Sequence, residues 1–484
     1  MSKMNQGRIA ATALAGGVAL LLAGCHLNKA YQRPDVPAAP AYRGAVQAAG
    51  ASDASAAAQP AEAVKSLGDE QWFKVFDDPV LVELIRQGIA QNYDLRIAAE
   101  RVTQARAQLG IAHADQLPSL NGTGSFASQQ YAKGQMGTNP DPILTNMGGV
   151  GLGAAWNLDF WGKYREATTA ARAQLLASEW ARRAVLDTVI ADIATAYIEL
   201  RTLDKQKEIA AQTLQTRQES LKLTETLEHE GSDSMLDVRE AEQLVYSAQA
   251  QISDLDRLIE QQEDTLSTLL GETPHAIARG NSIDRQPAMP EIPAGLPSEL
   301  LERRPDIKQA EALLMAAHAE IGVARAAYFP QIALTGSAGT NTNALSRLFT
   351  GPSYAWNYGP SMSVPIFDAH RIGNNVRMSE STERQAVLSY QQSIAAAFRD
   401  VSKGLVGYRR YREVREQQQK VVDAAADALK LSRLRYEHGH SSYLDVLTND
   451  RALLAAQLDL ATAKGNELLS LVQLYQSLGG GWKE

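Results

Sequence analysis

The chain of 484 residues is long enough for two or three ordinary domains, and it carries a formal net charge of -8. Without a basic excess to neutralise phosphates, the composition argues against a nucleic-acid-binding protein. Cys25 is the single cysteine, which excludes a disulfide bond within the chain.

Residues 1–24 predict a lipoprotein signal peptide. A short positive region precedes the apolar run Ile9–Leu22, which is too short and too interrupted by glycine to span a membrane comfortably. Leu22-Ala23-Gly24-Cys25 resembles the lipobox of bacterial lipoproteins, which implies that Cys25 becomes an acylated N-terminus. His26 stands where an inner-membrane retention signal has Asp, which indicates the outer membrane. The alternative is an ordinary signal peptide followed by a cysteine by chance.

Residues 25–66 form the predicted lipid-anchored N-terminal tether. From Ala30 to Ser66 the chain is rich in Ala, Pro, Ser and Gln and has no hydrophobic period. The organised part begins near Trp72.

The organised part contains an internal duplication. Two series of residues recur at a nearly constant offset: Asp94-Leu95, Gly110, Pro118 and Thr123-Gly124-Ser125 match Asp306-Ile307, Gly322, Pro330 and Thr335-Gly336-Ser337, and Gly231, Ser234 and Leu236-Asp237-Val238 match Gly439, Ser442 and Leu444-Asp445-Val446. We therefore expect a first repeat over residues 67–284, a linker over 285–297 and a second repeat over 298–484.

Each repeat begins with a predicted helix followed by two strands. The helices are expected at 78–114 and 298–328, because Pro118 and Pro330 stop each pattern. Apolar residues that alternate with Gly and Ser then predict strands. Their expected positions are about 119–130 and 148–160 in the first repeat, and about 330–340 and 355–367 in the second.

Very long helices complete each repeat. Neither Gly nor Pro occurs from Lys163 to Glu230 or from Ser232 to Leu270, and apolar residues recur with heptad spacing. At about 1.5 Å per residue, the first helix would be on the order of 100 Å long. A cytoskeletal or scaffold coiled coil is an alternative, but it leaves the strands unexplained.

The strands suggest a membrane-embedded wall. Their predicted lengths are close to those of transmembrane strands, which need about 9–11 residues. Aromatic residues such as Trp161 and Trp356 lie near their ends, as in interfacial girdles and also in ordinary sheet edges. Because four strands cannot close a barrel and lipid does not tolerate open sheet edges, we expect the chain to oligomerise.

Several motifs together resemble those of TolC-type outer-membrane factors, in particular the lipoprotein (NodT-like) branch of RND efflux systems. They are Leu22-Ala23-Gly24-Cys25, Tyr31-Gln32-Arg33-Pro34, Trp72-Phe73, Gln116-Leu117-Pro118-Ser119-Leu120, Leu158-Asp159-Phe160-Trp161-Gly162-Lys163, Glu302-Arg303-Arg304-Pro305-Asp306-Ile307, Val364-Pro365-Ile366-Phe367-Asp368 and Tyr443-Leu444-Asp445-Val446-Leu447. Each motif alone is weak, but the set covers essentially the whole mature chain.

This resemblance implies an α+β membrane protein with an internal duplication. A homotrimer would share a long α-helical coiled-coil barrel and a transmembrane β-barrel, with four strands from each chain. The implied function is the outer-membrane exit duct of a tripartite efflux pump. It would passively export substrates that an inner-membrane RND-type pump and a periplasmic adaptor, or membrane fusion protein, hand over. The resemblance implies contact with outer-membrane lipid and no cofactor, and it leaves the cargo and the resting state undefined.

The resemblance places Gly231 and Gly439 at the periplasmic hairpin tips, where glycine suits a tight reversal. Ser234 and Ser442 each precede an aspartate by three residues, an arrangement typical of a capping box. Helix capping is therefore the alternative to a gating role for these aspartates.

Related channels are constricted at this tip by rings of aspartate and by tyrosine–aspartate links. Asp445 matches the ring position, Tyr436 the linking tyrosine and Asp237 its partner. The chain departs from the pattern at two positions. Ser441 stands where some members have arginine, and Thr448 stands at a second ring position. Asp450 is then the nearby alternative carboxylate.

His438 and His440 flank Gly439 and could bind a metal or respond to pH. The first repeat has Glu230 and Ser232 at the equivalent positions, and no third ligand lies near in sequence. Solvated turn residues are therefore the preferred interpretation, and no metal is expected. The remaining histidines are expected on helix surfaces or in loops.

The sequence contains no Gly-x-Ser-x-Gly, P-loop, HExxH or dinucleotide motif, so an enzyme is not expected.

A periplasmic adaptor lipoprotein is a further alternative. It would require one hairpin inserted in a lipoyl-like domain, whereas this chain has two hairpins and two strand pairs.

Overall fold

The computed structural model describes residues 28–35, 78–132, 143–232, 234–285 and 297–480. The predicted signal peptide, Cys25 and most of the predicted tether lie outside these residues. The chain divides into two units. The first comprises 1–35, 101–178 and 309–390, and the second comprises 36–100, 179–308 and 391–484.

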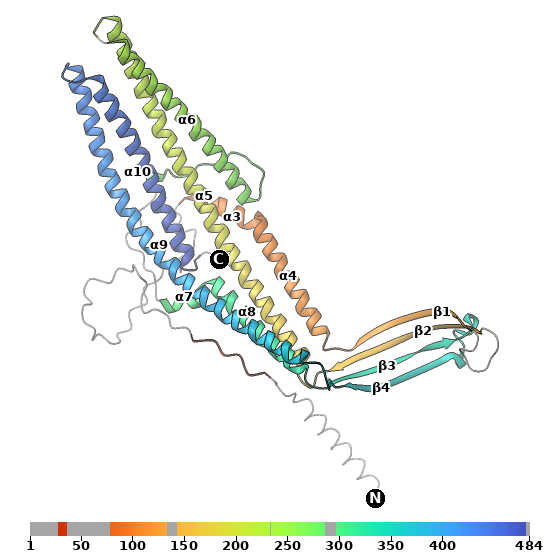
Figure 1. The fold of residues 1–484 in the computed structure, drawn as a ribbon. Coiled ribbons are helices and arrows are strands. Elements are labelled where there is room, and N and C mark those ends of the chain that lie inside the picture. The colour runs from red at the N-terminus through yellow and green to blue at the C-terminus, as the bar shows by residue number, and fades with distance from the viewer. Residues whose placement is uncertain (1–27, 36–77, 133–142, 233, 286–296, 481–484) are drawn as a thin grey trace, which may run out of the picture. The chain divides into compact units, whose positions relative to one another are not determined.

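A four-stranded antiparallel sheet forms one part of the first unit (Figure 1). Its order is β1-β2-β3-β4, with strands β1 (Ser119–Tyr131), β2 (Ile143–Leu158), β3 (Gln331–Thr342) and β4 (Tyr354–Ser363). The central pairing of β2 with β3 joins the two sequence repeats. Glycine is required at Gly339, because a Cβ atom there would lie 2.4 Å from the carbonyl oxygen of Val150 on β2.

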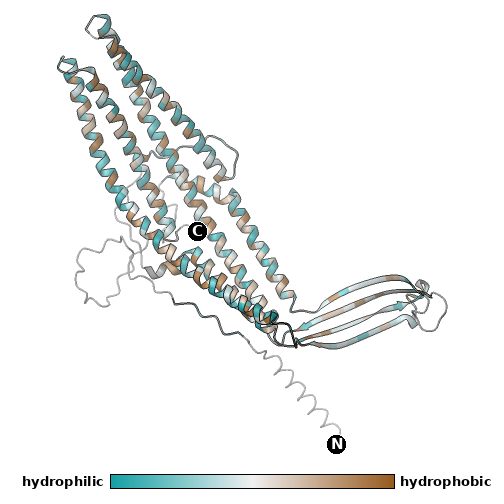
Figure 2. Ribbon diagram, in the orientation of Figure 1, coloured by the Kyte–Doolittle hydropathy of each residue, from teal (hydrophilic) through white to brown (hydrophobic). Residues whose placement is uncertain are grey.

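The two faces of the sheet differ in chemistry. The register pairs even-numbered residues with even-numbered residues across all four strands, for example Leu120 with Ala154 and Ala338 with Trp356. Large apolar side chains on this even-numbered face are exposed in the single chain: Leu120, Phe126, Leu144, Val150, Leu152, Trp156, Leu334, Tyr354, Trp356, Tyr358 and Met362. Most odd-numbered positions are Gly, Ala, Ser, Thr, Asn or Gln. Figure 2 shows this mixture of apolar and polar residues along the strands.

Two strand bounds differ from those expected by more than two residues. β2 begins at Ile143, earlier than the predicted residue 148, and pairs with β1 along its whole length. β4 ends at Ser363 rather than 367. Pro365 follows closely, and proline cannot donate a hydrogen bond to a strand partner.

The two shorter predicted helices are each broken. Asn92 separates α3 (Pro79–Gln91) from α4 (Tyr93–Ala114), because its side chain accepts from the Leu95 backbone N–H and donates to the Leu269 carbonyl. Arg304 separates α7 (Pro297–Arg303) from α8 (Pro305–Ala326). Proline disfavours helical geometry in the residue before it, and it suits the first position of a new helix.

The very long helices are present. Their bounds are α5 (Lys163–His229), α6 (Met235–Leu270), α9 (Arg371–Glu437) and α10 (Tyr443–Ser477). In the second unit, the heptad residues Ile190, Ile193, Tyr197 and Leu200 of α5 are buried. No helix within the described residues is long and apolar enough to cross a membrane.

Asp78 fixes the start of α3 in the second unit. Its buried carboxylate accepts hydrogen bonds from the Val80 backbone N–H at 2.9 Å, the Tyr197 hydroxyl at 3.0 Å and the Asn281 backbone N–H at 2.8 Å. The start of α3, the long helix α5 and the segment after α6 therefore meet at one carboxylate.

Residues 28–35, at the start of the predicted tether, contain no helix or strand and pack on helices of the first unit. The Asn28 amide donates to the His318 carbonyl at 2.7 Å, and Arg33 pairs with Glu311 at 3.1 Å. His318, expected on a helix surface or in a loop, lies on α8 and bridges Glu383 at 2.6 Å and the Lys29 carbonyl at 2.8 Å. Burial lowers the pKa of His318, but its hydrogen bonds to Glu383 and the Lys29 carbonyl outweigh burial and raise it.

Candidate functional site

The two helix reversals of the second unit are built on glycine. Gly231 (φ 75°) follows α5, and Gly439 (φ 73°) follows α9. The Ser232 N–H donates to the Leu227 carbonyl and the His440 N–H to the Arg435 carbonyl, both at 2.8 Å, which satisfies the last carbonyls of each helix. A side chain at either glycine would meet no atom within 4 Å, so the left-handed backbone is what favours glycine there.

The two copies of the turn start their second helices differently. Asp237 forms a full capping box. Its carboxylate accepts from the Ser234 backbone N–H at 3.2 Å, and its own N–H donates to the Ser234 hydroxyl. Ser442 makes no side-chain capping bond at the start of α10, contrary to the expectation of a capping box in both copies. Asp445 is exposed, and no described residue forms a hydrogen bond or ion pair with its carboxylate.

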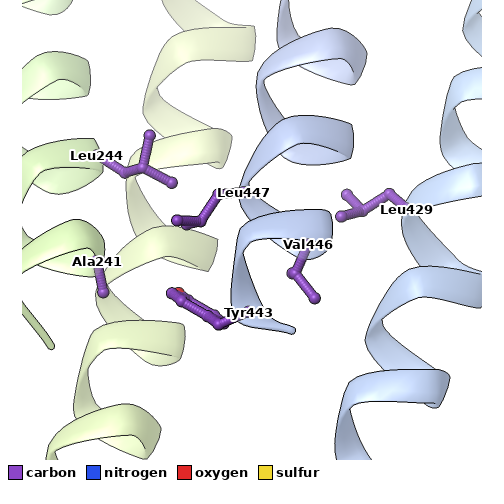
Figure 3. Close-up of a cluster of buried hydrophobic side chains, with 6 residues drawn as sticks. All are labelled: Ala241, Leu244, Leu429, Tyr443, Val446 and Leu447. Atoms are coloured by element: carbon purple, nitrogen blue, oxygen red, sulfur yellow. The ribbon is translucent and has the colours of Figure 1, made fainter. Parts of the chain in front are cut away.

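The start of α10 is held by apolar packing instead. Six buried side chains, shown in Figure 3, form a cluster between the two hairpins: Ala241, Leu244, Leu429, Tyr443, Val446 and Leu447. Tyr436 packs against this cluster, with its ring centroid 5.2 Å from that of Tyr443. Tyr436 is therefore part of the contact between the end of α9 and the start of α10.

Asp450 is buried rather than open to solvent. Its Oδ2 lies 2.8 Å from Nε of Arg217 on α5, and its Oδ1 lies 3.7 Å from Nη2 of Arg433 on α9. Arg217 also donates to the Leu244 carbonyl on α6 at 3.0 Å. The carboxylate on α10 thus contacts α5 and α9, and Arg217 extends this network to α6. This placement argues against Asp450 as a pore-facing acid, which the sequence could not reveal because the two arginines lie far away along the chain.

The turn histidines are exposed. His438 contacts the Leu434 carbonyl at 2.7 Å through Nδ1, and Arg435 donates to the His440 carbonyl. Within the described part of the chain, no group of three or more His, Cys, Asp or Glu side chains is arranged to hold a metal ion.

The sequence and fold match known outer-membrane proteins. The model of the family "Outer membrane efflux protein" matches residues 84–272 and 296–480. The solvent efflux pump outer membrane protein SrpC of Pseudomonas putida is 37% identical over 463 residues, which are 96% of this chain and 97% of that protein. The probable outer membrane lipoprotein SilC of Salmonella typhimurium is 34% identical over 466 residues, 96% of this chain and 97% of that protein.

A solved structure has the same fold. The open state of the MtrE outer membrane channel of Neisseria gonorrhoeae superimposes with a TM-score of 0.82 at 30% identity, covering 95% of this chain and 99% of that chain.

Replacement of Asp450 by Asn is expected to lower the free energy of unfolding of the second unit by about 3–5 kcal/mol, because it leaves the buried Arg217 without its counter-charge. Thermal unfolding of the detergent-solubilised protein, followed by helical circular dichroism, measures the loss. Asp459→Asn, an exposed acid on the same helix, is the control and should change stability by no more than ~0.5 kcal/mol. Equal effects of the two substitutions would show that the Arg217–Asp450 pair does not hold the hairpins together.

Proposed function

The chain belongs to the outer membrane efflux protein family, and we propose that its two helix reversals form the gate at the periplasmic end of an exit duct. As a member of this family it is an outer-membrane transport channel and not an enzyme. The observation that carries the gate proposal is the unequal use of two equivalent acids: Asp237 is engaged in a capping box, whereas Asp445 is exposed and unengaged.

A ring of Asp445 side chains is the proposed constriction. In a symmetric trimer three such carboxylates would face one axis, attract cations and repel one another. Tyr436 supports the ring by packing on Tyr443, two residues before Asp445. Asp237 is the proposed partner of Tyr436 across the two hairpins.

A homotrimer is the proposed assembly, because one edge of β1 and one edge of β4 have no partner strand within the described part of the chain. The apolar even-numbered face would contact lipid and the small polar face would line the lumen. We further propose that an inner-membrane RND-type pump and a periplasmic adaptor deliver the cargo, since SrpC is named as part of an efflux pump.

Cys25 is the proposed lipid attachment site. It ends a lipobox-like Leu-Ala-Gly-Cys, and SilC bears the name of a lipoprotein. The attachment point lies only three residues before Asn28, where the chain is already bound to α8, so an acyl group would be held close to the first unit.

Asp445→Ala is expected to raise the single-channel conductance in planar bilayers and to lower the preference for cations, because it removes the ring of charge. Tyr436→Ala should also raise conductance through loss of packing. Tyr436→Phe separates the two roles of the tyrosine: it keeps the ring contact and removes the hydroxyl needed for a link to Asp237. Asp264→Ala, an exposed acid on α6, is the control. Unchanged conductance and selectivity in Asp445→Ala would reject the proposed constriction.

Cross-linking in intact cells is expected to give a species of three chains, together with larger species that contain an adaptor and an inner-membrane pump. Mass spectrometry identifies the partners. A chain that remains monomeric after efficient cross-linking would contradict the trimer, and a trimer without partners would contradict only the pump assignment.

Cys25→Ser should abolish incorporation of labelled palmitate, because it removes the acceptor thiol. The measurement is fluorography of the immunoprecipitated chain. Labelling that persists in the variant would place the lipid elsewhere or reject it.

A further inference from the structure

A pocket of about 320 Å³ lies in the second unit, away from the helix reversals. It is formed by α5, by the break between α7 and α8, by α9 and by α10. Its size is at the lower end of the roughly 300–1,000 Å³ typical of small-molecule sites. Thr188 and Lys403 are exposed and Asp187 is buried, so the pocket runs from solvent towards a carboxyl group.

Asp187 is the unusual group in this pocket. Asp187 is only 7% exposed, and its Oδ1 atom is buried without a hydrogen-bond partner among the described residues. A buried carboxylate without a donor is costly, because it has lost water and gained nothing in exchange. A group with N–H or O–H donors would relieve that cost.

Arg304, whose charge acts on Asp187, is already engaged by other groups. Arg304 lies 2.6 Å from Asp306 and 3.6 Å from Asp400, and it also donates to the Ser477 carbonyl at 3.1 Å. Lys403, on α9, is exposed to solvent. The charged lining comprises three carboxylates and two cations, and Arg399, which does not line the pocket, pairs with Asp400 at 2.8 Å. Among the described residues, Asp187 is therefore the carboxylate of the lining that no cation pairs with. The lining residues from α10 are uncharged.

We propose that this pocket binds a small primary ammonium or guanidinium group, whose N–H donors pair with Asp187 and whose charge balances that of its carboxylate. A single unengaged carboxylate is too few ligands for a divalent metal, which prefers several oxygen donors. The cationic group could be a free amine or a Lys or Arg side chain of a neighbouring copy, and the experiment below separates these sources. The site shares no residue with the proposed gate, so its test is independent of that function.

The proton is the competing occupant. Burial, and to a lesser degree the charge of Asp306, raise the pKa of Asp187 to about 8, although Arg304 opposes the shift. Binding of a cation must therefore release a proton, and the affinity rises with pH. With the pocket empty, the folded chain holds a proton that the unfolded chain has released between about pH 4 and pH 8. Stability should accordingly fall as the pH rises through that window.

The test compares methylammonium chloride with tetramethylammonium chloride at equal concentration. Both are monovalent cations, but only methylammonium has N–H donors. Heat unfolding of the detergent-solubilised trimer is followed by helical circular dichroism at pH 6 and pH 9. We expect methylammonium to raise the Tm by roughly 1–2 °C over tetramethylammonium at pH 9, and by less at pH 6.

Asp187→Asn should remove the difference between the two salts and flatten the fall in Tm from pH 6 to pH 9. The control is Asp192→Asn, an acid with an exposed side chain on the same helix that does not line the pocket and whose pKa is also raised by partial desolvation. If a neighbouring copy supplies the cation, added methylammonium has no effect, but Asp187→Asn lowers the temperature at which the trimer dissociates at pH 9. Equal effects of both salts together with unchanged dissociation in Asp187→Asn would overturn the proposal.

Discussion

The need to pair backbone hydrogen-bonding groups in lipid determines the organisation of this protein. The chain supplies four strands that share a largely apolar face, and among the described residues no further strand pairs with either outer edge. Lipid offers no donor or acceptor for such edges, so strands of this kind are stable only in a closed ring. Closure by identical chains imposes rotational symmetry on every other element. In such an assembly an acid such as Asp445 would recur around the axis, which is the arrangement that the proposed gate requires.

Duplication produced two hairpins with similar turns, and the structure shows how they have diverged. In the first copy the capping box uses Asp237, a contribution of about 1 kcal/mol that fixes the start of α6. In the second copy, burial of Tyr443 against α6 and α9 replaces the cap. The carboxylate of Asp445 is released from a structural role by this exchange. The aspartate of the shared tripeptide Leu-Asp-Val thus caps a helix in one hairpin and makes no capping bond in the other.

The sequence predicted those features that depend on neighbouring residues. Heptad spacing and the absence of Gly and Pro predicted α5, and Gly231 and Gly439 predicted the reversals. Features that depend on distant partners were missed. The side chain of Asn92 breaks a helix by bonding to Leu269, and Asp450 is buried because Arg217 lies opposite it. Periodicity shows which face of a helix is apolar, but it does not show which residue of another helix faces a given acid.

Two buried aspartates of the second unit differ in whether the chain itself supplies a cation to balance their charge. Asp450 lies between two arginines, so its charge is compensated by the chain and its role is to hold helices together. Asp187 lies beside an arginine that two other carboxylates already occupy, so its charge is not compensated. A low-dielectric site resolves such an excess by taking up a proton or a cation. An acid paired within the chain contributes to the contact between helices, whereas an unpaired acid such as Asp187 makes the stability of its surroundings depend on the protons and cations that the solution supplies.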